Sequence, residues 1–172
     1  MTPRVDILQL DAPTLRALAD GDLAAANRSS PVRLTPYLAG EDCRRVWGIR
    51  AVQVVDEPES ADWITGIVWD PERRLAVGRA GFHGPPDDTG MVEIGYSIDP
   101  QHRRQGYARA ALRALMERAR REPAVNTFRA TVSPDNAPSR DLVVSEGLVE
   151  VGEQMDDEDG LEIIYERDVT TS

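Results

Sequence analysis

The residues with the clearest chemical potential lie at 94–119, where an apolar strand pattern passes through a short basic turn into a helix. In chain order, the turn and the residues after it are Arg103, Arg104, Gln105, Gly106, Tyr107 and Ala108. If they form the first turn of the helix, their N–H groups lack partners within the helix and lie at its positive end, which suits phosphate. Gly106 lets a ligand approach the backbone, and guanidinium groups pair with phosphate oxygens. The pattern predicts a phosphate-bearing cofactor, although an ordinary turn with a solvated basic face has the same composition.

The elements around this turn must hold it in place. Residues 91–98 are predicted as a strand, and from Gln105 apolar residues recur on one helical face with arginines on the other. Residues 127–132 read as the next strand, and 133–138 offer a cap and an early proline for a short helix closing at Gly147. This order indicates a β-α-β crossover in the middle of the fold.

The rest of the chain predicts a mixed α and β fold in which antiparallel strands come first. A proline-containing turn at 70–73 joins two β-rich runs into a hairpin, and an acidic loop at 156–160 separates the last two strands. The predicted strands outside the crossover are 5–10, 63–69, 74–82, 148–151 and 161–167, and the predicted early helices are 13–26 and 37–55.

Composition limits the possible functions. The 172 residues are 41% apolar, which suits one globular domain, and no apolar run approaches the ~20 residues that span a bilayer. The net charge of -10 argues against nucleic acid, because such binding needs a basic face. The single cysteine, Cys43, cannot form an internal disulfide, and the first thirty residues lack a secretory pattern. We therefore expect a cytoplasmic protein that binds neither nucleic acid nor membrane.

Arg103, Gly106 and Ala108 have the spacing of the acyl-coenzyme-A loop, Gln/Arg-x-x-Gly-x-Gly/Ala, of the GNAT acetyltransferase superfamily. The strand at 92–98 resembles the central strand of that family, and residues 132–152 resemble its last β-to-helix unit and next strand. The chain is most similar to the branch that includes acetyltransferases of ribosomal-protein N-termini. The resemblance implies an α/β (α+β) GNAT fold: a mostly antiparallel sheet, flanked by helices, with a V-shaped opening between its central strands.

The same resemblance implies a site for acetyl-coenzyme A. The amides of residues 103–108 would hold the pyrophosphate, and the backbone near Ile98 would bond the pantetheine arm. Asn136 would contact the pantetheine or amine side of coenzyme A, and Ser139 would lie near its sulfur. Either residue could instead cap the helix that starts beside Pro138, and Ser139 could also face water. Tyr107 is interpreted as a packing or adenine-side residue.

Acetyl transfer to an amine requires a group that accepts a proton from the ammonium. Glu93 is the first candidate, because a carboxylate within an apolar strand must face solvent or a cleft, and burial would raise its pKa. An ordered water could act instead, and Glu93 could be a plain solvated residue. Ser139 is the candidate donor to the leaving sulfur, since many relatives use a tyrosine one turn along that helix and residues 142–144 contain none.

The sequence thus predicts one GNAT domain over 1–172, with acceptor-side helices at 1–60 and the core sheet and acetyl-coenzyme A site at 63–168. The expected acceptor is a primary amine, either a peptide N-terminus or a small cationic amine attracted by residues 156–159. No metal is expected, since two histidines and one cysteine form no spaced ligand set. Oligomeric state stays open, with a homodimer possible. The alternatives are a catalytically silent coenzyme-A-binding module and, with a poorer glycine pattern, a Rossmann-type nucleotide-binding protein.

Overall fold

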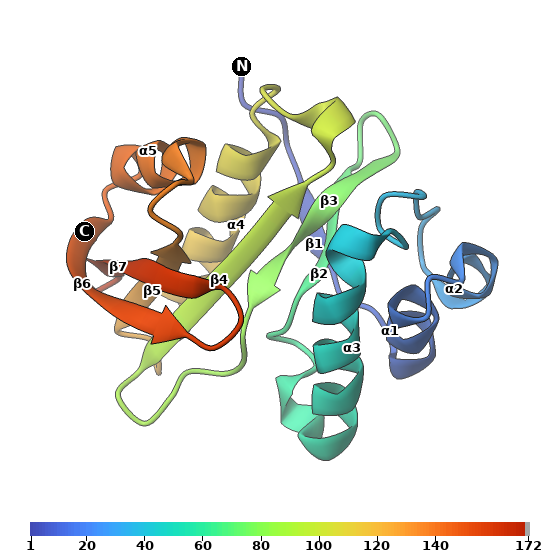
Figure 1. The fold of residues 1–172 in the computed structure, drawn as a ribbon, viewed down its shortest axis with the longest axis horizontal. Helices are drawn as coiled ribbons and strands as arrows, with labels where there is room; N and C mark the ends of the chain where they lie inside the picture. Colours follow the sequence, from blue (N-terminus) through green and yellow to red (C-terminus); the bar gives the residue numbers. More distant parts are fainter. Residues whose placement is uncertain (171–172) are drawn as a thin grey trace.

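One sheet runs through residues 1–170, the part of the chain that the computed structural model describes. The strands are β1 (Asp6–Leu8), β2 (Gly66–Asp70), β3 (Leu75–Phe82), β4 (Met91–Ile98), β5 (Thr127–Val132), β6 (Val149–Asp156) and β7 (Gly160–Asp168). The helices are α1 (Ala12–Ala19), α2 (Leu23–Ser29), α3 (Glu41–Asp56), α4 (Tyr107–Arg121) and α5 (Ala137–Ser145). The sheet order is β1-β2-β3-β4-β5-β7-β6, and all neighbours are antiparallel except β4 and β5 (Figure 1). The predicted mixed fold and its β4-α4-β5 crossover are confirmed.

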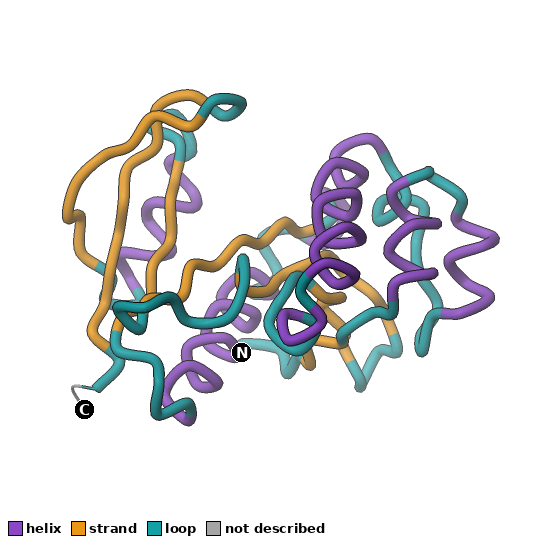
Figure 2. Tube along the Cα trace, turned by 90° about the horizontal axis from the view of Figure 1, so that it is seen from below, coloured by secondary structure: helices purple, strands orange, loops and turns teal. Residues whose placement is uncertain are grey.

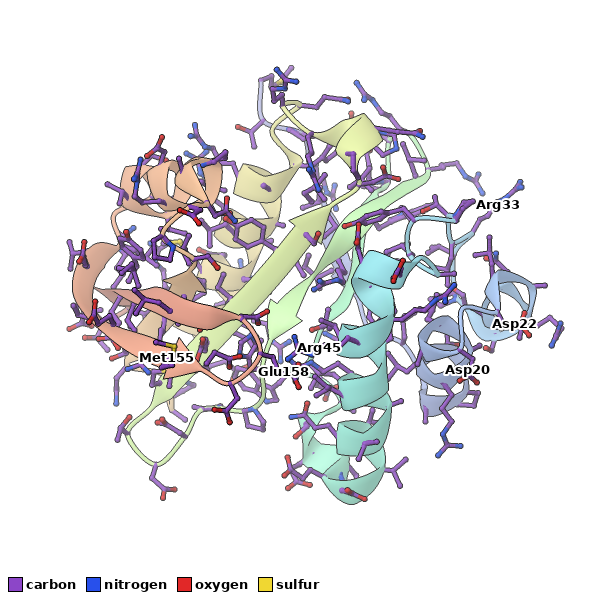
Figure 3. All side chains as sticks on the ribbon, viewed as in Figure 1. Asp20, Asp22, Arg33, Arg45, Met155 and Glu158 are labelled. Atoms are coloured by element: carbon purple, nitrogen blue, oxygen red, sulfur yellow. The ribbon has the colours of Figure 1, made fainter. Side chains whose placement is uncertain are left out.

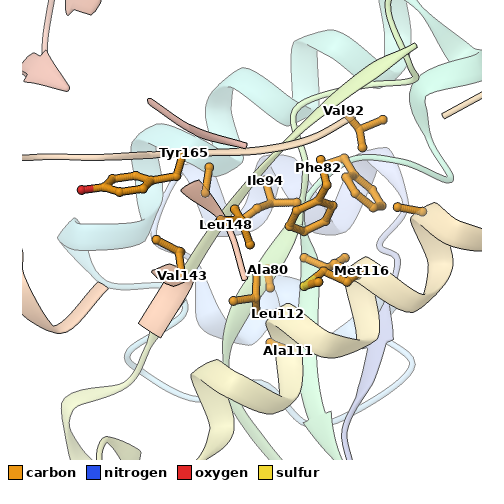
Figure 4. Packing of buried hydrophobic residues seen from close by; sticks show 14 of the residues in the cluster. Ala80, Phe82, Val92, Ile94, Ala111, Leu112, Met116, Val143, Leu148 and Tyr165 are labelled. Carbon is orange, nitrogen blue, oxygen red and sulfur yellow. The ribbon is translucent and has the colours of Figure 1, made fainter. Parts of the chain in front are cut away.

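Two apolar cores cover opposite faces of the sheet. On one face, α4 packs Leu112 and Met116 against Phe82 and Ile94 of the central strands (Figure 4). On the other face, α1 and α3 bury their side chains against β2 and β3, with Trp47 fully buried. Each large apolar side chain buried in this way contributes about 1.5–3 kcal/mol. The central strands are therefore held from both sides.

The V-shaped opening arises because β4 and β5 pair over only part of their length. Their parallel ladder runs from Met91 opposite Thr127 to Ile94 opposite Ala130. Beyond Ile94, β4 continues beside β3 while β5 continues beside β7. Figure 2 shows the strands nearest the C-terminus standing apart from the rest of the sheet. The residues of β4 after Ile94 thus lack a neighbour on their β5 side.

The predicted single helix over 13–26 is wrong, because two helices occupy this region. Gly21 has φ of 72°, a left-handed conformation that ends α1. The Asp22 carboxylate then accepts a hydrogen bond from the Ala25 N–H at 2.9 Å and caps α2. Alanine and leucine have the same helix propensity in α1 and α2, so they give no sign of a break. The break depends on the sequence Asp20-Gly21-Asp22.

Other predicted boundaries were also displaced. The strand predicted over 63–69 begins at Gly66, and the strand predicted over 148–151 continues to Asp156. The helix predicted over 37–55 begins at Glu41, after turns at residues 36–39. The acidic loop predicted over 156–160 is a tighter turn, because Asp156 ends β6 and Gly160 begins β7. The Asp156 carboxylate accepts the N–H groups of Glu158 and Asp159, each at 2.8 Å, which closes the turn. Within residues 1–170, no helix is both long and apolar enough to cross a membrane.

Candidate active site

A cleft of about 1340 Å³ opens where β4 has separated from β5, beside the start of α4 and the start of α5. Its walls include Tyr96 and Ser97 of β4, which lie beyond the last β4–β5 pair. Nine of the sequence-predicted site residues line it, namely Ile98, Arg103, Arg104, Gln105, Gly106, Tyr107, Ala108, Asn136 and Ser139. Glu93 is not among the lining residues.

The start of α4 leaves backbone donors facing the cleft. Gly106 has φ of 88° and precedes the helix, and no side chain caps it within the described residues. The first helical bond runs from the Ala110 N–H to the Gly106 carbonyl at 3.0 Å. The N–H groups of the three residues between them therefore have no acceptor within the helix. They lie at the positive end of the helix dipole, which is an arrangement that binds phosphate.

The predicted first turn at 103–108 was wrong in its boundary. A 3-10 turn at Pro100–His102 follows β4, and α4 starts only at Tyr107. Arg104 has φ of 58°, so the backbone at 103–106 is a loop rather than helix. The backbone N–H groups without a helical acceptor still directly follow Gly106, because the loop ends at this residue and the helix starts at the next one.

The side chains of this loop are partly engaged with the protein. The Arg103 Nε donates to the Ile98 carbonyl at 3.0 Å, which ties the loop to the end of β4. The Gln105 amide accepts from Arg73 and donates to the Gln101 carbonyl, each at 3.2 Å. The mouth of the cleft thus carries the positive charges of Arg103 and Arg104 beside the helix start.

Tyr107 holds α4 to the sheet through its side chain. Its ring is buried, its hydroxyl donates to the Asp70 Oδ2 at 2.7 Å, and Arg73 donates to that hydroxyl at 3.2 Å. Burial pushes the pKa of Asp70 upward, but hydrogen bonds from the backbone of Arg73, from Tyr107 and from the backbone of Glu72 outweigh it and lower that pKa. Tyr107 therefore offers the cleft its backbone N–H, while its phenol is a packing group.

We expect Tyr107→Phe to lower the free energy of unfolding by about 1.5–3 kcal/mol at neutral pH, because it removes a hydrogen bond to a buried carboxylate. The lowered pKa of Asp70 makes its hydrogen bonds stabilising above the unfolded-state pKa, and this contribution disappears as pH falls through the folded-state pKa. Denaturant titrations should therefore show a smaller difference between the two proteins in acid. An undiminished difference in acid would contradict this role.

Asn136 and Ser139 are brought together at the start of α5. The Asn136 Oδ1 accepts from the Ser139 N–H at 3.2 Å, so Asn136 caps the helix while it lines the cleft. The buried Tyr96 hydroxyl has no full hydrogen bond within residues 1–170. Burial raises the pKa of this phenol, and the nearby Ser139 opposes that rise. Sequence reasoning missed Tyr96, although it is a hydroxyl-bearing residue near the end of a strand expected to splay.

Glu93 lies on the other face of β4, where β4 still pairs with β5. Its Oε1 accepts from the Thr131 hydroxyl at 2.9 Å and lies 3.9 Å from the His83 Nδ1. Burial raises the pKa of Glu93, against smaller lowering effects of Thr131 and Arg129. Its side chain is 18% exposed, so the group is a largely buried carboxylate with some access to solvent.

His83, which sequence reasoning treated only as a possible metal ligand, adjoins this carboxylate. Partial burial of the ring and the positive charge of Arg50 lower the pKa of His83 to about 4. At neutral pH the imidazole is uncharged, so it does not form an ion pair with Glu93. Among residues 1–170, no group of three or more potential metal-binding side chains is present.

Residues 11–149 match a family model described as an acetyltransferase (GNAT) domain. The match covers well over half of this chain. The chain belongs to the GNAT acetyltransferase family. It is 36% identical over 73 residues to the uncharacterized N-acetyltransferase YjdG of Bacillus subtilis (strain 168), a match covering 42% of this chain but only 44% of YjdG. It is 25% identical over 157 residues to the uncharacterized N-acetyltransferase YoaA of the same strain, covering 85% and 84% of the two chains.

Among solved structures, this GNAT chain is similar to RimL, a ribosomal L7/L12 alpha-N-protein acetyltransferase, in complex with coenzyme A. The TM-score is 0.67 at 16% identity, over 98% of this chain and 96% of that one. At this identity the likeness shows a shared fold.

GNAT acetyltransferases use acetyl-coenzyme A, and the residues present fit that group. The cleft is large enough for an extended ligand, its unpaired N–H groups and arginines suit a diphosphate, and its unpartnered phenol offers a hydrogen bond. The residues that would hold the diphosphate are those of the loop from Arg103 through Ala108.

Proposed function

We propose that this chain transfers an acetyl group from acetyl-coenzyme A to a primary amine bound on the α3 side of the sheet. The observation that carries the proposal is the set of unpaired backbone donors at the start of α4, opening into a cleft at the splay of β4 and β5. When bound, acetyl-coenzyme A supplies a thioester whose C–S bond breaks as the C–N bond to the amine forms.

Within this proposal, the protein's main contribution is alignment. The loop from Arg103 to Ala108 fixes one end of the ligand, and β4 residues beyond Ile94 have free edges for the pantetheine arm. Holding two reactants in register makes the step effectively unimolecular, which supplies much of the rate. No covalent acetyl-enzyme step is needed, and Cys43 is fully buried in the core beneath α3 and does not line the cleft.

Glu93 is proposed to take the proton from the acceptor, directly or through a water. Its raised pKa makes it a better base near neutral pH than a solvated carboxylate. The Thr131 hydroxyl and the neutral His83 ring hold its carboxylate on the α3 side of the sheet. Because Glu93 does not line the cleft, a bound water between it and the amine is the simplest route.

Ser139 and Tyr96 are proposed to donate hydrogen bonds to the leaving sulfur. Both line the cleft, and the raised pKa of Tyr96 keeps its hydroxyl protonated. We expect Ser139→Ala to lower kcat by roughly 10- to 100-fold with little change in the KM for acetyl-coenzyme A. Steady-state kinetics beside Ser145→Ala, an exposed serine of the same helix, provide the matched control. Equal kcat values in the two variants would remove Ser139 from the mechanism.

The test of the proposed function is a library of primary amines, including peptide N-termini and polyamines, incubated with the protein and acetyl-coenzyme A. We expect an acetylated amine by mass spectrometry and matching release of the coenzyme A thiol. Binding of coenzyme A without product or thiol release for every amine would support the silent coenzyme-A-binding module instead.

The predicted cationic acceptor rests on the acidic turn between β6 and β7, and it stays a prediction. Two of its carboxylates, those of Glu158 and Asp159, form ion pairs with Arg45 of α3. Figure 3 shows Arg45 and Glu158 facing each other across the front of the sheet. Asp156 is engaged by the backbone of the turn, which leaves Asp157 as its remaining carboxylate.

A further inference from the structure

Two arginines lie together on the face of the sheet that carries Glu93. Arg79 is in β3, directly opposite Ser97 of β4, and Arg50 is in α3. The positive charge of Arg79 lowers the pKa of Arg50, after the larger effect of burial, and also affects Tyr37 and His83. Their positions agree with this, because Arg50 bonds Thr65 and the Thr65 backbone closely approaches Gly81, two residues along β3 from Arg79. The two guanidinium groups therefore have the same charge and lie in one region of this face.

Arg79 has no counter-charge. Its Nε is buried without a hydrogen-bond partner, and across residues 1–170 its guanidinium forms no hydrogen bond or ion pair. Buried charges in proteins are normally paired, because an unpaired one loses hydration and receives nothing in return. An unpaired arginine beside a second arginine is therefore a costly arrangement in the unliganded protein.

Arg50 is held in place without being neutralised. Its Nε donates to the Thr65 hydroxyl at 3.2 Å, and its Nη1 donates to the Gln53 amide oxygen at 2.7 Å and to the His83 carbonyl at 3.2 Å. All three acceptors are uncharged, so the guanidinium keeps its full positive charge. The bonds fix Arg50 next to the residue that adjoins Glu93.

Among the described residues, no carboxylate forms an ion pair with Arg50 or Arg79. Glu166 is paired with Arg129, while Glu93 and Glu162 accept hydrogen bonds from the neutral Thr131 and Gln154 side chains. Two carboxylates of the acidic turn, those of Glu158 and Asp159, are paired with Arg45 of α3. The charges of Arg50 and Arg79 thus have no ion-pair partner among residues 1–170 and are available to a bound anionic group.

The position of the pair suits an acceptor. Ser97, the cross-strand partner of Arg79, lines the cleft, and its hydroxyl lies 2.5 Å from that of Tyr37. Ser97 and Glu93 lie on the same face of β4, four residues or about 13 Å apart along the strand. A molecule with its amine near Glu93 and an anionic group near Arg79 therefore spans at most about four extended residues. It spans fewer once the two long side chains and the water beside Glu93 take up part of that distance.

We propose that the acceptor carries a carboxylate a short distance from its amine, and that Arg79 and Arg50 bind this carboxylate. The inference rests on the proposed acetyl transfer and names its substrate class. Guanidinium groups bind carboxylates in a two-pronged geometry, and one carboxylate between two arginines removes both the unpaired charge and the repulsion. The carboxylate belongs either to a free amino acid or to an acidic residue at a peptide N-terminus.

The test measures acetyl-coenzyme-A-dependent thiol release with acceptors that differ in one group. One arm compares free amino acids with their amides, a second compares N-terminal peptides bearing aspartate or glutamate with their asparagine or glutamine counterparts, and a third uses a polyamine. We expect kcat/KM to be at least about 10-fold higher for the carboxylate-bearing member of one pair. The arm in which this occurs identifies the source of the carboxylate.

Arg79→Gln should lower kcat/KM for the carboxylate-bearing acceptor by roughly 10- to 100-fold, mainly through KM, and leave its amide counterpart unchanged. Arg79→Lys should retain part of the preference for the carboxylate-bearing acceptor. Lysine keeps the positive charge but lacks the planar guanidinium that binds a carboxylate through two N–H groups. The Tm of Arg79→Gln should not fall, because the Arg79 guanidinium has no hydrogen-bond or ion-pair partner among residues 1–170. Arg121→Gln, which alters an exposed arginine of α4, is the matched control.

Three results would overturn the inference while leaving acetyl transfer intact. The first is an equal kcat/KM for charged and neutral acceptors, and the second is a preference for the polyamine. The third is an equal loss of kcat/KM for both members of a pair in Arg79→Gln. A lowered Tm would assign Arg79 a structural role. Absence of thiol release in all arms, with calorimetric binding of coenzyme A retained, would instead overturn the proposed function and this inference with it.

Discussion

Gly106→Ala is expected to weaken binding of coenzyme A at least about 10-fold, equivalent to about 1.4 kcal/mol. Gly106 has φ of 88°, and an added Cβ would lie 3.0 Å from the Pro3 Cδ. An L-residue pays roughly 1–2 kcal/mol in this conformation, so the loop relieves the strain by moving. Any such movement turns the unpaired N–H groups of the α4 start away from the position they share. Isothermal titration calorimetry with coenzyme A measures the change.

Two other glycines separate site effects from backbone strain. Gly160 has φ of 77° with open space around an added Cβ, so Gly160→Ala carries the same conformational strain far from the cleft. Gly152 has open space and an ordinary φ, so Gly152→Ala controls for the substitution alone. We expect both to bind coenzyme A like the unaltered protein, and Gly160→Ala to lose stability by an amount similar to Gly106→Ala. Equal affinities of the Gly106 and Gly160 variants would show that the α4 start does not hold the ligand.

Glu93→Gln is expected to lower kcat about 100-fold or more, while coenzyme A binding stays unchanged. A glutamine can still accept the Thr131 hydrogen bond, but it cannot take a proton from the acceptor. The substitution also removes a charge whose burial raises the pKa of Glu93, so the Tm at neutral pH should not fall. Steady-state kinetics, calorimetry and thermal melts test the three parts. Glu153→Gln, an exposed residue of β6, is the matched control.

The pH dependence gives an independent readout of the same residue. The base acts as a carboxylate, so kcat/KM must fall as pH falls through its pKa. Because burial raises the pKa of Glu93, this acid limb lies at higher pH than for a solvated glutamate, and Glu93→Gln should abolish it. An unchanged acid limb in the variant would assign proton removal to another group.

The loop proposed to bind phosphate was largely predictable because its signal is local. The change from strand period to helix period, the position of Gly106 and the paired arginines are all visible within 94–119. The start of the helix was not predictable, since it depends on the 3-10 turn at Pro100–His102 and on the positive φ of Arg104. Pro100 marks the 3-10 turn, but the left-handed backbone that separates this turn from the helix lies at Arg104, where no glycine signals it.

Arg79 was not predictable for a different reason. Strict alternation along β3 would place Arg79 on the same face as Val77. The register between β2 and β3 shifts at Val68 and Trp69, and Val77, Ala80 and Phe82 consequently share one core. This irregularity puts Arg79 on the α3 face, beside Arg50 and His83. A β-bulge has no reliable sequence signature, so the proposed anion-binding pair, Arg50 and Arg79, emerges only from the fold.

Calorimetric titration of acetyl-coenzyme A into the unaltered protein tests the central claim most directly. The account predicts one binding site per chain, with an affinity that falls as salt increases because backbone dipoles and arginines hold a diphosphate. Absence of binding at millimolar ligand, or binding that Gly106→Ala leaves untouched, would contradict it.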